Sequence, residues 1–330
     1  MTNIKVSVIL PFYNKEKTAA KTLNSLINQT IFKNLELICV DDCSKDKTYD
    51  IISSYAKKYN NIKAYQNEKN RSVYYSRKRA IRYATGEYIG FIDPDDWIDK
   101  TYYEELYESA KRYNADIAQT KSIVMYFGKD KNGDPKYNFN KSSLFVGDCV
   151  NGLISITPET LRAYFWECPT AILWHRIFKA SLMKQCDRLP PFYIRRSSDV
   201  VFVFDCLFRA KTLLTINSVS NYYYDSSNEV SHLTNATNKQ PILRDDSLAI
   251  VFAIVDAIIL ETDNNKYSEF VKHFRERRGV WLTDKYKSLF KKVENFDGSY
   301  SYVIPRENLL LAESLKLEIE DFNRMMRGTQ

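Results

Sequence analysis

The sequence predicts an α/β fold in which a mostly parallel sheet is flanked by helices, followed by a helical C-terminal region. Short apolar runs alternate with longer amphipathic stretches over about the first third of the chain, a pattern typical of βαβ units. The runs are rich in branched and aromatic residues, as expected of strands that are buried on both faces of a sheet. Several runs end abruptly in polar residues, which is typical of the strand ends where open α/β sheets bind ligands.

The expected elements follow one another closely along the chain. Strands are predicted at Lys5–Leu10, Leu35–Val40, Ile62–Tyr65 and Tyr88–Ile92, with Pro11 ending the first of them. Helices are predicted at Lys17–Asn28, Thr48–Tyr59, Val73–Tyr83, Tyr102–Arg112 and Val200–Ala210. The segment Met125–Asn140 is polar and contains Gly128, Gly133 and Pro135, so we expect a loop or a hairpin near the active face.

The composition changes near residue 235, which divides the chain into a first domain, 1–235, and a C-terminal region, 236–330. Helices are predicted in this second region at Arg244–Leu260, Tyr267–Lys292 and Asn308–Met326. The middle helix mixes aromatic residues with many lysines and arginines, a pattern that favours contact with an anionic membrane surface. A helix packed on the first domain, with a solvated basic face, explains the same pattern equally well.

The composition is that of an ordinary soluble globular protein, with 44% hydrophobic and 27% charged residues. The net charge of +7 is modest, and we expect no nucleic-acid partner. The six cysteines form no Cys-x-x-Cys pair, which favours buried thiols in a reducing cytoplasm. No signal peptide is recognised, and the longest apolar segment, Leu248–Leu260, is too short to span a bilayer. These features predict a cytoplasmic protein, with peripheral contact at the inner face of the membrane as a further option.

Polar side chains follow the first, second and fourth predicted strands. These are Tyr13 and Asn14, then Asp41 and Asp42, then Asp93, Asp95 and Asp96. Because the carboxyl ends of parallel strands meet at one edge of a sheet, we expect these groups to lie together. Their carboxylate oxygens suit Mg²⁺ or Mn²⁺ that carries substrate phosphates. The alternative is a solvated turn in which Asp96 or Asp99 caps the helix that begins at Tyr102.

The sequence lacks the glycine-rich phosphate loops that many nucleotide-binding folds use. No Gly-x-Gly-x-x-Gly and no Gly-Lys-Ser/Thr follows the first strand, which disfavours a dinucleotide site and a P-loop. A metal ion on the aspartate cluster and the region of Arg71 and Arg77 are the remaining means of holding phosphates.

Four ordered motifs resemble those of family 2 glycosyltransferases, which have the GT-A fold. They are Pro-Phe-Tyr-Asn at 11–14, Ser-Leu-Ile-Asn-Gln-Thr at 25–30, Glu-Leu-Ile-Cys-Val-Asp-Asp-Cys-Ser-Lys-Asp at 36–46 and Thr-Gly-Glu-Tyr-Ile-Gly-Phe-Ile-Asp-Pro-Asp-Asp at 85–96. The match is close over the region of these motifs and becomes looser towards Tyr224. The resemblance implies an inverting enzyme that moves a sugar from a nucleotide-sugar donor to a hydroxyl group.

The resemblance also implies roles for individual residues. Tyr13 and Asp42 match positions that hold the nucleotide base, and the donor-binding set further includes Pro11, Asp41, Arg71 and Arg77. Asp93 and Asp95 match the Asp-x-Asp motif, in which Asp95 is the principal ligand of the divalent ion and Asp93 faces the ribose or the metal. Asp199 matches the acidic residue that serves as general base. The alternative for Asp199 is an N-cap of the helix at Val200–Ala210.

Trp174 and Asp96 are candidates for the acceptor side of the site. Trp174 lies in a segment, Leu173–Lys179, that resembles the part of the family leading towards the acceptor, although a buried core tryptophan explains it equally well. The stretch Asn70–Ala80 departs from the family pattern because Ser72, Lys78 and Ala80 replace the usual residues, with Ser72 in place of a glycine.

The predicted function is metal-dependent hexosyl transfer in the synthesis of a surface polysaccharide or lipooligosaccharide on a lipid-linked acceptor. The predicted donor is UDP-galactose or another UDP-hexose, because the Phe91–Asp96 run and the Trp174 segment resemble bacterial β-1,3-galactosyltransferases. One alternative is a nucleotidyltransferase, which also uses paired aspartates and Mg²⁺ but would need a glycine-rich loop. The other is a non-catalytic nucleotide-sugar-binding protein, which the departures around Arg77 leave open.

Overall fold

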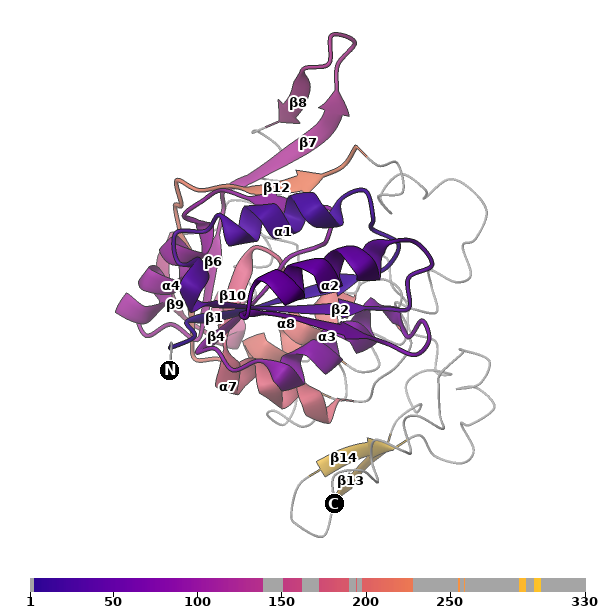
Figure 1. The fold of residues 1–330 in the computed structure, drawn as a ribbon. Helices are drawn as coiled ribbons and strands as arrows, with labels where there is room; N and C mark the ends of the chain where they lie inside the picture. The colour runs from indigo at the N-terminus through magenta and orange to yellow at the C-terminus, as the bar shows by residue number, and fades with distance from the viewer. Residues whose placement is uncertain are drawn as a thin grey trace, which may run out of the picture.

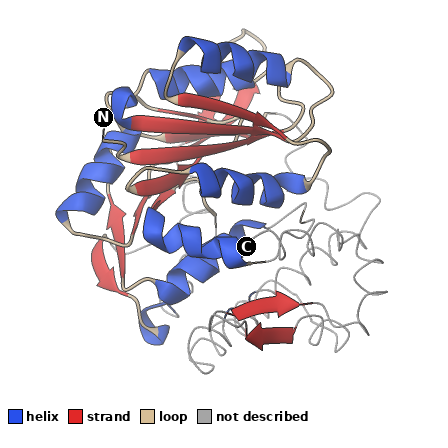
Figure 2. Cartoon of the chain, turned by 60° about the horizontal axis from the view of Figure 1, so that its bottom comes forward, coloured by secondary structure: helices blue, strands red, loops and turns tan. Residues whose placement is uncertain are grey.

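A central eight-stranded sheet with helices on both faces forms the body of the protein in this computed structural model (Figures 1 and 2). The structure describes residues 3–138, 151–161, 172–189 and 198–227, the single positions 194, 255 and 258, and two short strands at 291–294 and 300–303. The strands follow the order β3-β2-β1-β4-β10-β6-β11-β9. Most neighbours are parallel, whereas β10 runs antiparallel to β4 and β6, and β9 antiparallel to β11.

The bounds of the elements around the large sheet agree with the predicted order. Its strands are β1 (Val6–Phe12), β2 (Leu35–Asp41), β3 (Ile62–Gln66), β4 (Tyr88–Phe91), β6 (Ile117–Thr120), β9 (Gly152–Ser155), β10 (Arg176–Lys179) and β11 (Thr212–Ile216). The helices are α1 (Ala19–Ile27), α2 (Thr48–Lys58), α3 (Ser72–Tyr83), α4 (Tyr102–Arg112), α7 (Ala180–Met183) and α8 (Ser198–Arg209), with short 3-10 turns at Phe32–Asn34 and Lys184–Arg188.

The core lies on both faces of the parallel strands. Every residue of β1, β2 and β4 is buried, as expected where helices cover both sides of a sheet. Successive residues of β4 face opposite layers: Gly90 lies under the ring of Tyr103 from α4, whereas Phe91 packs against Phe202 from α8. A Cβ atom at Gly90 would come within 2.7 Å of the Tyr103 ring, so only glycine allows this close approach.

Strand β1 continues through Pro11, where the sequence predicted its end. The backbone of Ile9 faces β4, because its carbonyl accepts a hydrogen bond from the N–H of Ile92. By the alternation of a strand, the backbone of Pro11 faces the same side, and β4 pairs with β1 only as far as Ile9. The missing N–H of Pro11 therefore removes no ladder bond, and proline is tolerated there.

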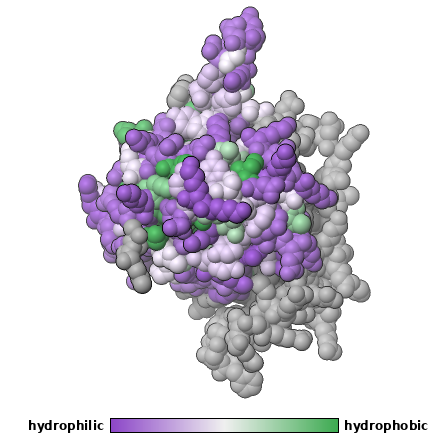
Figure 3. Space-filling view, in the orientation of Figure 1, coloured by the Kyte–Doolittle hydropathy of each residue, from purple (hydrophilic) through white to green (hydrophobic). Residues whose placement is uncertain are grey.

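A smaller sheet, in the order β5-β12-β7-β8, adjoins the carboxyl end of β4. It contains β5 (Trp97–Ile98), β12 (Tyr222–Asp225), β7 (Ile123–Lys129) and β8 (Pro135–Asn138). The expected loop or hairpin within 125–140 is thus a hairpin, which projects from the body in Figure 1 and carries a hydrophilic tip in Figure 3.

Little of the C-terminal region lies within the described residues. Val255 and Ile258, in the expected helix Arg244–Leu260, are helical and buried. Lys291 and Lys292, placed at the end of a helix by the sequence, instead begin β13 (Lys291–Glu294), which pairs with β14 (Tyr300–Val303). The remainder of the predicted helices and the proposed membrane contact lie outside the described residues. Within the described part of the chain, no helix has the length and apolar character needed to cross a bilayer.

Candidate active site

The loops after β1, β2 and β4 meet at the carboxyl edge of the large sheet and are fastened to one another. The hydroxyl of Thr18, just before α1, donates to the carbonyl of Pro94 over 2.8 Å. The hydroxyl of Thr22 donates to the carbonyl of Asp96 over 2.7 Å. The backbone of Asn14 donates to Ser44 over 2.9 Å. The predicted gathering of polar strand ends is therefore present, with the aspartate loop tied to the start of α1.

Asp41 and Asp42 are both buried and hold neighbouring loops. Asp42 Oδ1 accepts hydrogen bonds from Asn67 Nδ2 (2.7 Å) and the N–H of Arg71 (2.8 Å), and its Oδ2 accepts from the N–H of Ser72 (2.9 Å). Burial raises the pKa of Asp42, although these hydrogen bonds oppose the shift. Asp41 Oδ2 accepts from the N–H of Ser44 over 3.0 Å. Both carboxylates thus hold the loop after β2 and the loop that leads into α3.

Ser72 takes an unusual backbone conformation at the start of α3. Its φ of +81° lies in the left-handed region, and its buried hydroxyl has no hydrogen-bond partner within the described residues. The hydrogen bond from its N–H to Asp42 helps to hold this conformation. A glycine at this position would adopt the same φ without a Cβ penalty.

Tyr13 presents the accessible aromatic ring of this edge. Its side chain is 41% exposed, in contrast to Pro11, which is buried in β1. Arg71 lies in the loop that Asp42 holds, and its guanidinium carbon is 4.3 Å from the centre of the Tyr75 ring.

The three aspartates after β4 have different environments. Asp95 pairs with Lys15 Nζ and is 24% exposed. Asp93 pairs with Arg77 Nη2 over 3.0 Å and is 31% exposed. Burial of its carboxyl, opposed by Arg77 and reinforced by neighbouring carboxylates, raises the pKa of Asp93 to about 6. Burial acts to lower the pKa of Lys15, but the carboxylate of Asp95 and its neighbours outweigh burial and raise it.

Asp199 reaches the same cluster from the first turn of α8. Arg77 Nη1 lies 2.5 Å from Asp199 Oδ1, and the N–H of Leu173 donates to Asp199 Oδ2 over 3.2 Å. The Asp199 side chain is 20% exposed. Its hydrogen bonds thus go to α3 and to the segment before β10, and no cap bond to the N-terminus of α8 is present among the described residues. This arrangement disfavours the N-cap alternative.

A match to a family of known proteins agrees with this arrangement. The family model described as "Glycosyl transferase family 2" matches residues 7–186, more than half of the chain, and so spans β1 to β10 with the aspartate loop between them.

The chain belongs to glycosyl transferase family 2.

Individual relatives of this glycosyltransferase differ in the sugars that their names give. The poly(ribitol-phosphate) beta-glucosyltransferase of Bacillus spizizenii is 30% identical over 92% of this chain and 46% of its own length. The cholesterol galactosyltransferase of Borreliella burgdorferi is 27% identical over 70% of this chain and 62% of its own. The chain therefore spans less than two-thirds of the length of either relative.

A solved structure has the same fold as this glycosyltransferase. The crystal structure of residues 1–349 of TarS from S. aureus, in complex with UDP-GlcNAc, aligns with a TM-score of 0.64. The two proteins are 24% identical, and the alignment covers 84% of this chain and 74% of that one. The expected GT-A architecture is thereby confirmed.

The glycosyltransferase has carboxylates that fit a divalent cation at the end of β4. Asp93 Oδ2 and Asp95 Oδ1 accept no hydrogen bond within the described part of the chain, and both side chains are partly exposed. The described residues contain no group of three His, Cys, Asp or Glu side chains that could hold a metal ion. Two carboxylates with open oxygens could each provide a ligand, and substrate phosphates would have to complete the coordination of such an ion.

Asp96 and Trp174 do not fit the acceptor contacts expected of them. Asp96 is 1% exposed, and its carboxylate accepts hydrogen bonds from Tyr222 Oη (2.5 Å) and the N–H of Asp225 (2.8 Å). Burial raises the pKa of Asp96 well above its usual range. Trp174 is 4% exposed and stacks on Tyr222 with ring centres 4.4 Å apart. Tyr222 therefore contacts both side chains, Asp96 at the end of the aspartate loop and the buried Trp174. Asp96 also does not cap α4, whose N-cap is Thr101.

Two residues of this site were missed in the sequence. Lys15 directly follows the Pro-Phe-Tyr-Asn motif, and that position at the end of a predicted strand, opposite the predicted aspartates, was an available signal. Tyr222 lies in a run of three tyrosines, and strand alternation could have placed Tyr222 and Tyr224 on one face.

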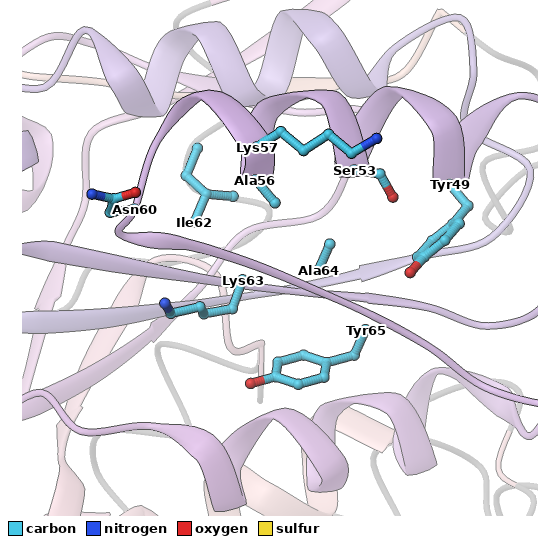
Figure 4. A pocket seen from close by; sticks show the side chains of 9 residues that line it. All are labelled: Tyr49, Ser53, Ala56, Lys57, Asn60, Ile62, Lys63, Ala64 and Tyr65. Carbon is cyan, nitrogen blue, oxygen red and sulfur yellow. The ribbon is translucent and has the colours of Figure 1, made fainter.

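A surface hollow between α2 and β3 is separate from this site. It is lined by Tyr49, Ser53, Ala56, Lys57, Asn60, Ile62, Lys63, Ala64 and Tyr65 (Figure 4). None of these residues belongs to the acidic cluster, so we assign the hollow no part in sugar transfer.

Proposed function

We propose that this glycosyltransferase moves a hexose from a UDP-sugar to a hydroxyl group of a cell-surface glycan, with inversion at the anomeric carbon. The observation that carries the proposal is the position of Arg77, whose guanidinium contacts both Asp93 and Asp199. A carboxylate of the donor-binding motif and the candidate base therefore lie on two sides of one buried cation. A direct displacement needs donor and acceptor to be held next to each other, and these two carboxylates lie close enough to bind them side by side.

The donor would lie across the carboxyl edge of β1, β2 and β4. The exposed ring of Tyr13 is available for stacking on the base, and the loop held by Asp42 borders it. Asp95 and Asp93 would hold Mn²⁺ or Mg²⁺ against the diphosphate. Such an ion, when bound, neutralises the charge that develops on the leaving diphosphate.

The acceptor would approach Asp199. Each carboxylate oxygen of Asp199 accepts one hydrogen bond within the described residues, and an oxygen has a second lone pair for a proton. The acceptor oxygen forms a bond to the anomeric carbon while the bond from that carbon to the phosphate oxygen breaks. The hydroxyl proton passes to Asp199, and the bonding electrons leave with UDP. A single displacement of this kind inverts the configuration.

The names of the relatives bear on the donor and the acceptor. They include transferases of glucose, galactose and N-acetylglucosamine, so a UDP-hexose is supported without favouring galactose. Several relatives act on poly(ribitol-phosphate) by name, which makes a polyol-phosphate polymer of the cell surface our preferred acceptor class over lipooligosaccharide. Family membership also favours a glycosyltransferase over a nucleotidyltransferase and over a non-catalytic nucleotide-sugar-binding protein.

The test is turnover of a donor panel by the purified protein. UDP-glucose, UDP-galactose and UDP-N-acetylglucosamine are each incubated with poly(ribitol-phosphate) and Mn²⁺, and UDP release and polymer mass are measured. We expect one donor to give acceptor-dependent UDP release and a mass increase that corresponds to its own sugar, a hexose unit or an N-acetylhexosamine unit. Absence of transfer from all three, with an intact fold, would count against the proposed donor and acceptor classes.

A further inference from the structure

Lys15 places an ammonium group directly on the candidate metal ligand. Its Nζ donates a hydrogen bond to Asp95 Oδ2, and the two side chains are 33% and 24% exposed. The nearby carboxylate of Asp93 also attracts this ammonium group. The proposed displacement gives Lys15 no role. Its ammonium group nevertheless contacts Asp95, the carboxylate that would also bind the divalent ion.

The backbone around Lys15 is fixed, unlike that of a loosely tethered surface lysine. Its N–H donates to Thr48 Oγ1 over 2.7 Å, and its carbonyl accepts from the N–H of Ala19 over 2.9 Å. The preceding residue, Asn14, has a φ of +51° and donates its N–H to Ser44. The loop after β2 and the start of α1 therefore hold the position from which this side chain extends.

The aspartate loop is fixed from the same side. Thr18 binds the carbonyl of Pro94, and Thr22 binds that of Asp96, so the residues flanking Asp95 are attached to the start of α1. The ammonium and the carboxylate consequently face each other across two loops that are fastened together. Their pairing follows from the fold of both loops rather than from a chance surface encounter.

We propose that Lys15 competes with the divalent ion for Asp95 in the donor-free enzyme and moves to the donor diphosphate when ion and donor bind. This inference rests on the proposed metal-binding role of Asp95. Two cations that share one carboxylate repel each other, so the ion binds at the expense of the lysine pair. A lysine ammonium is a compact charge on a flexible stem, and it can exchange a carboxylate for a phosphate oxygen while its backbone stays in place.

The first measurement is Mn²⁺ binding without donor, followed by electron paramagnetic resonance. We compare wild type, Lys15→Met, Lys17→Met and Asp95→Asn. Lys17 is exposed in the same loop, so its variant controls for the loss of one positive charge. Lys15→Met is expected to bind Mn²⁺ roughly fivefold more tightly than wild type, because a competing ion pair is gone. Lys17→Met is expected to stay close to wild type.

The second measurement is UDP binding at saturating Mn²⁺, by calorimetry. The ion then occupies Asp95 and displaces Lys15 towards the diphosphate, so Lys15→Met is expected to bind UDP roughly tenfold more weakly than wild type. Lys17→Met again serves as the matched control. Thermal unfolding of each variant checks that the loops remain folded.

Each outcome decides something specific. Equal Mn²⁺ affinity of wild type and Lys15→Met, or equal UDP affinity of the two at saturating Mn²⁺, overturns the proposal while leaving the metal site intact. Loss of Mn²⁺ binding in Asp95→Asn supports the metal site itself. If neither wild type nor Lys15→Met binds Mn²⁺, the metal role of Asp95 fails, and this proposal fails with it.

Discussion

The guanidinium of Arg77 lies 2.5 Å from the carboxylate of Asp199, although the two residues belong to different helices, α3 and α8. Its other terminal nitrogen lies 3.0 Å from Asp93, and the Arg77 side chain is only 4% exposed. One buried cation thus joins the aspartate loop after β4 to the candidate base on α8. Asp93 and Asp199 both pair with Arg77, so a substitution at either aspartate needs a control for the loss of its ion pair with Arg77.

Asp199→Asn is expected to lower kcat by about 10²–10⁴-fold, because an amide cannot take the proton of the acceptor hydroxyl. The amide oxygen can still accept from Arg77, so we expect the affinity for UDP to change little. Steady-state kinetics, calorimetry with UDP and thermal unfolding on one preparation provide the measurements.

Ser198→Ala is the matched control for this change. Arg77 Nη1 also donates to Ser198 Oγ over 3.0 Å, so alanine removes a partner of Arg77 but leaves the carboxylate. This variant should retain most of kcat. If Asp199→Asn turned over at nearly the wild-type rate, the base would have to lie elsewhere.

Asp95→Asn is expected to abolish nearly all transfer while leaving the fold intact. An amide is a much weaker ligand than a carboxylate for a hard cation, so the charge on the leaving diphosphate would lack its counterion. EDTA should inhibit the wild type, and added Mn²⁺ or Mg²⁺ should restore it. Asp50→Asn, which neutralises an exposed carboxylate on α2, should behave as wild type. Full activity of the wild type in EDTA would exclude the metal role.

Ser72→Gly is expected to raise the free energy of unfolding by roughly 1 kcal/mol. Glycine adopts the φ of +81° without strain and removes a buried hydroxyl that lacks a partner among the described residues, although the unfolded chain gains entropy. Urea denaturation measures the change. Ser72→Ala keeps the Cβ atom and removes only the hydroxyl, so it should gain less. A loss of stability in Ser72→Gly would show that the left-handed conformation is not strained.

Lys78 should make stability depend on pH above neutrality. Burial lowers the pKa of Lys78 to about 7, and its Nζ donates to the carbonyl of Asp187 over 2.8 Å. Between about pH 10.5 and pH 7 the unfolded chain binds a proton on this lysine that the folded chain does not. Stability of the wild type therefore falls, relative to Lys78→Met, as the pH is lowered through this window, by an amount on the order of a few kcal/mol.

Urea denaturation at several pH values between 7 and 10 tests this dependence. Lys78→Met also loses two hydrogen bonds to backbone carbonyls, but that loss adds a constant offset, so only the pH-dependent part is diagnostic. Lys57→Met, on the exposed face of α2, should show no such trend. A difference between Lys78→Met and wild type that stays constant across this range would mean that Lys78 remains charged when folded.

Much of the fold could be predicted because its information is local. The apolar runs predicted β1, β2, β3 and β4 to within two residues. For β1, β2 and β4 the physical reason is that a strand buried on both faces must be largely apolar along its length. The abrupt change to acidic residues at Asp93 likewise marked a strand end, and parallel strands bring such ends to one edge. Candidate ligands of the site were therefore recognisable before any contact was known.

The partners of those side chains were decided only by the tertiary structure. Nothing local in the sequence indicates that Arg77 joins Asp93 to Asp199, that Lys15 pairs with Asp95, or that Trp174 is buried against Tyr222. These contacts link segments from separate loops and helices, and a pairing over such a separation exists only after the chain has closed around its core. Residue patterns determine which groups reach the edge of the sheet. Packing determines which of them remain accessible to substrate and which are used to hold the site in place.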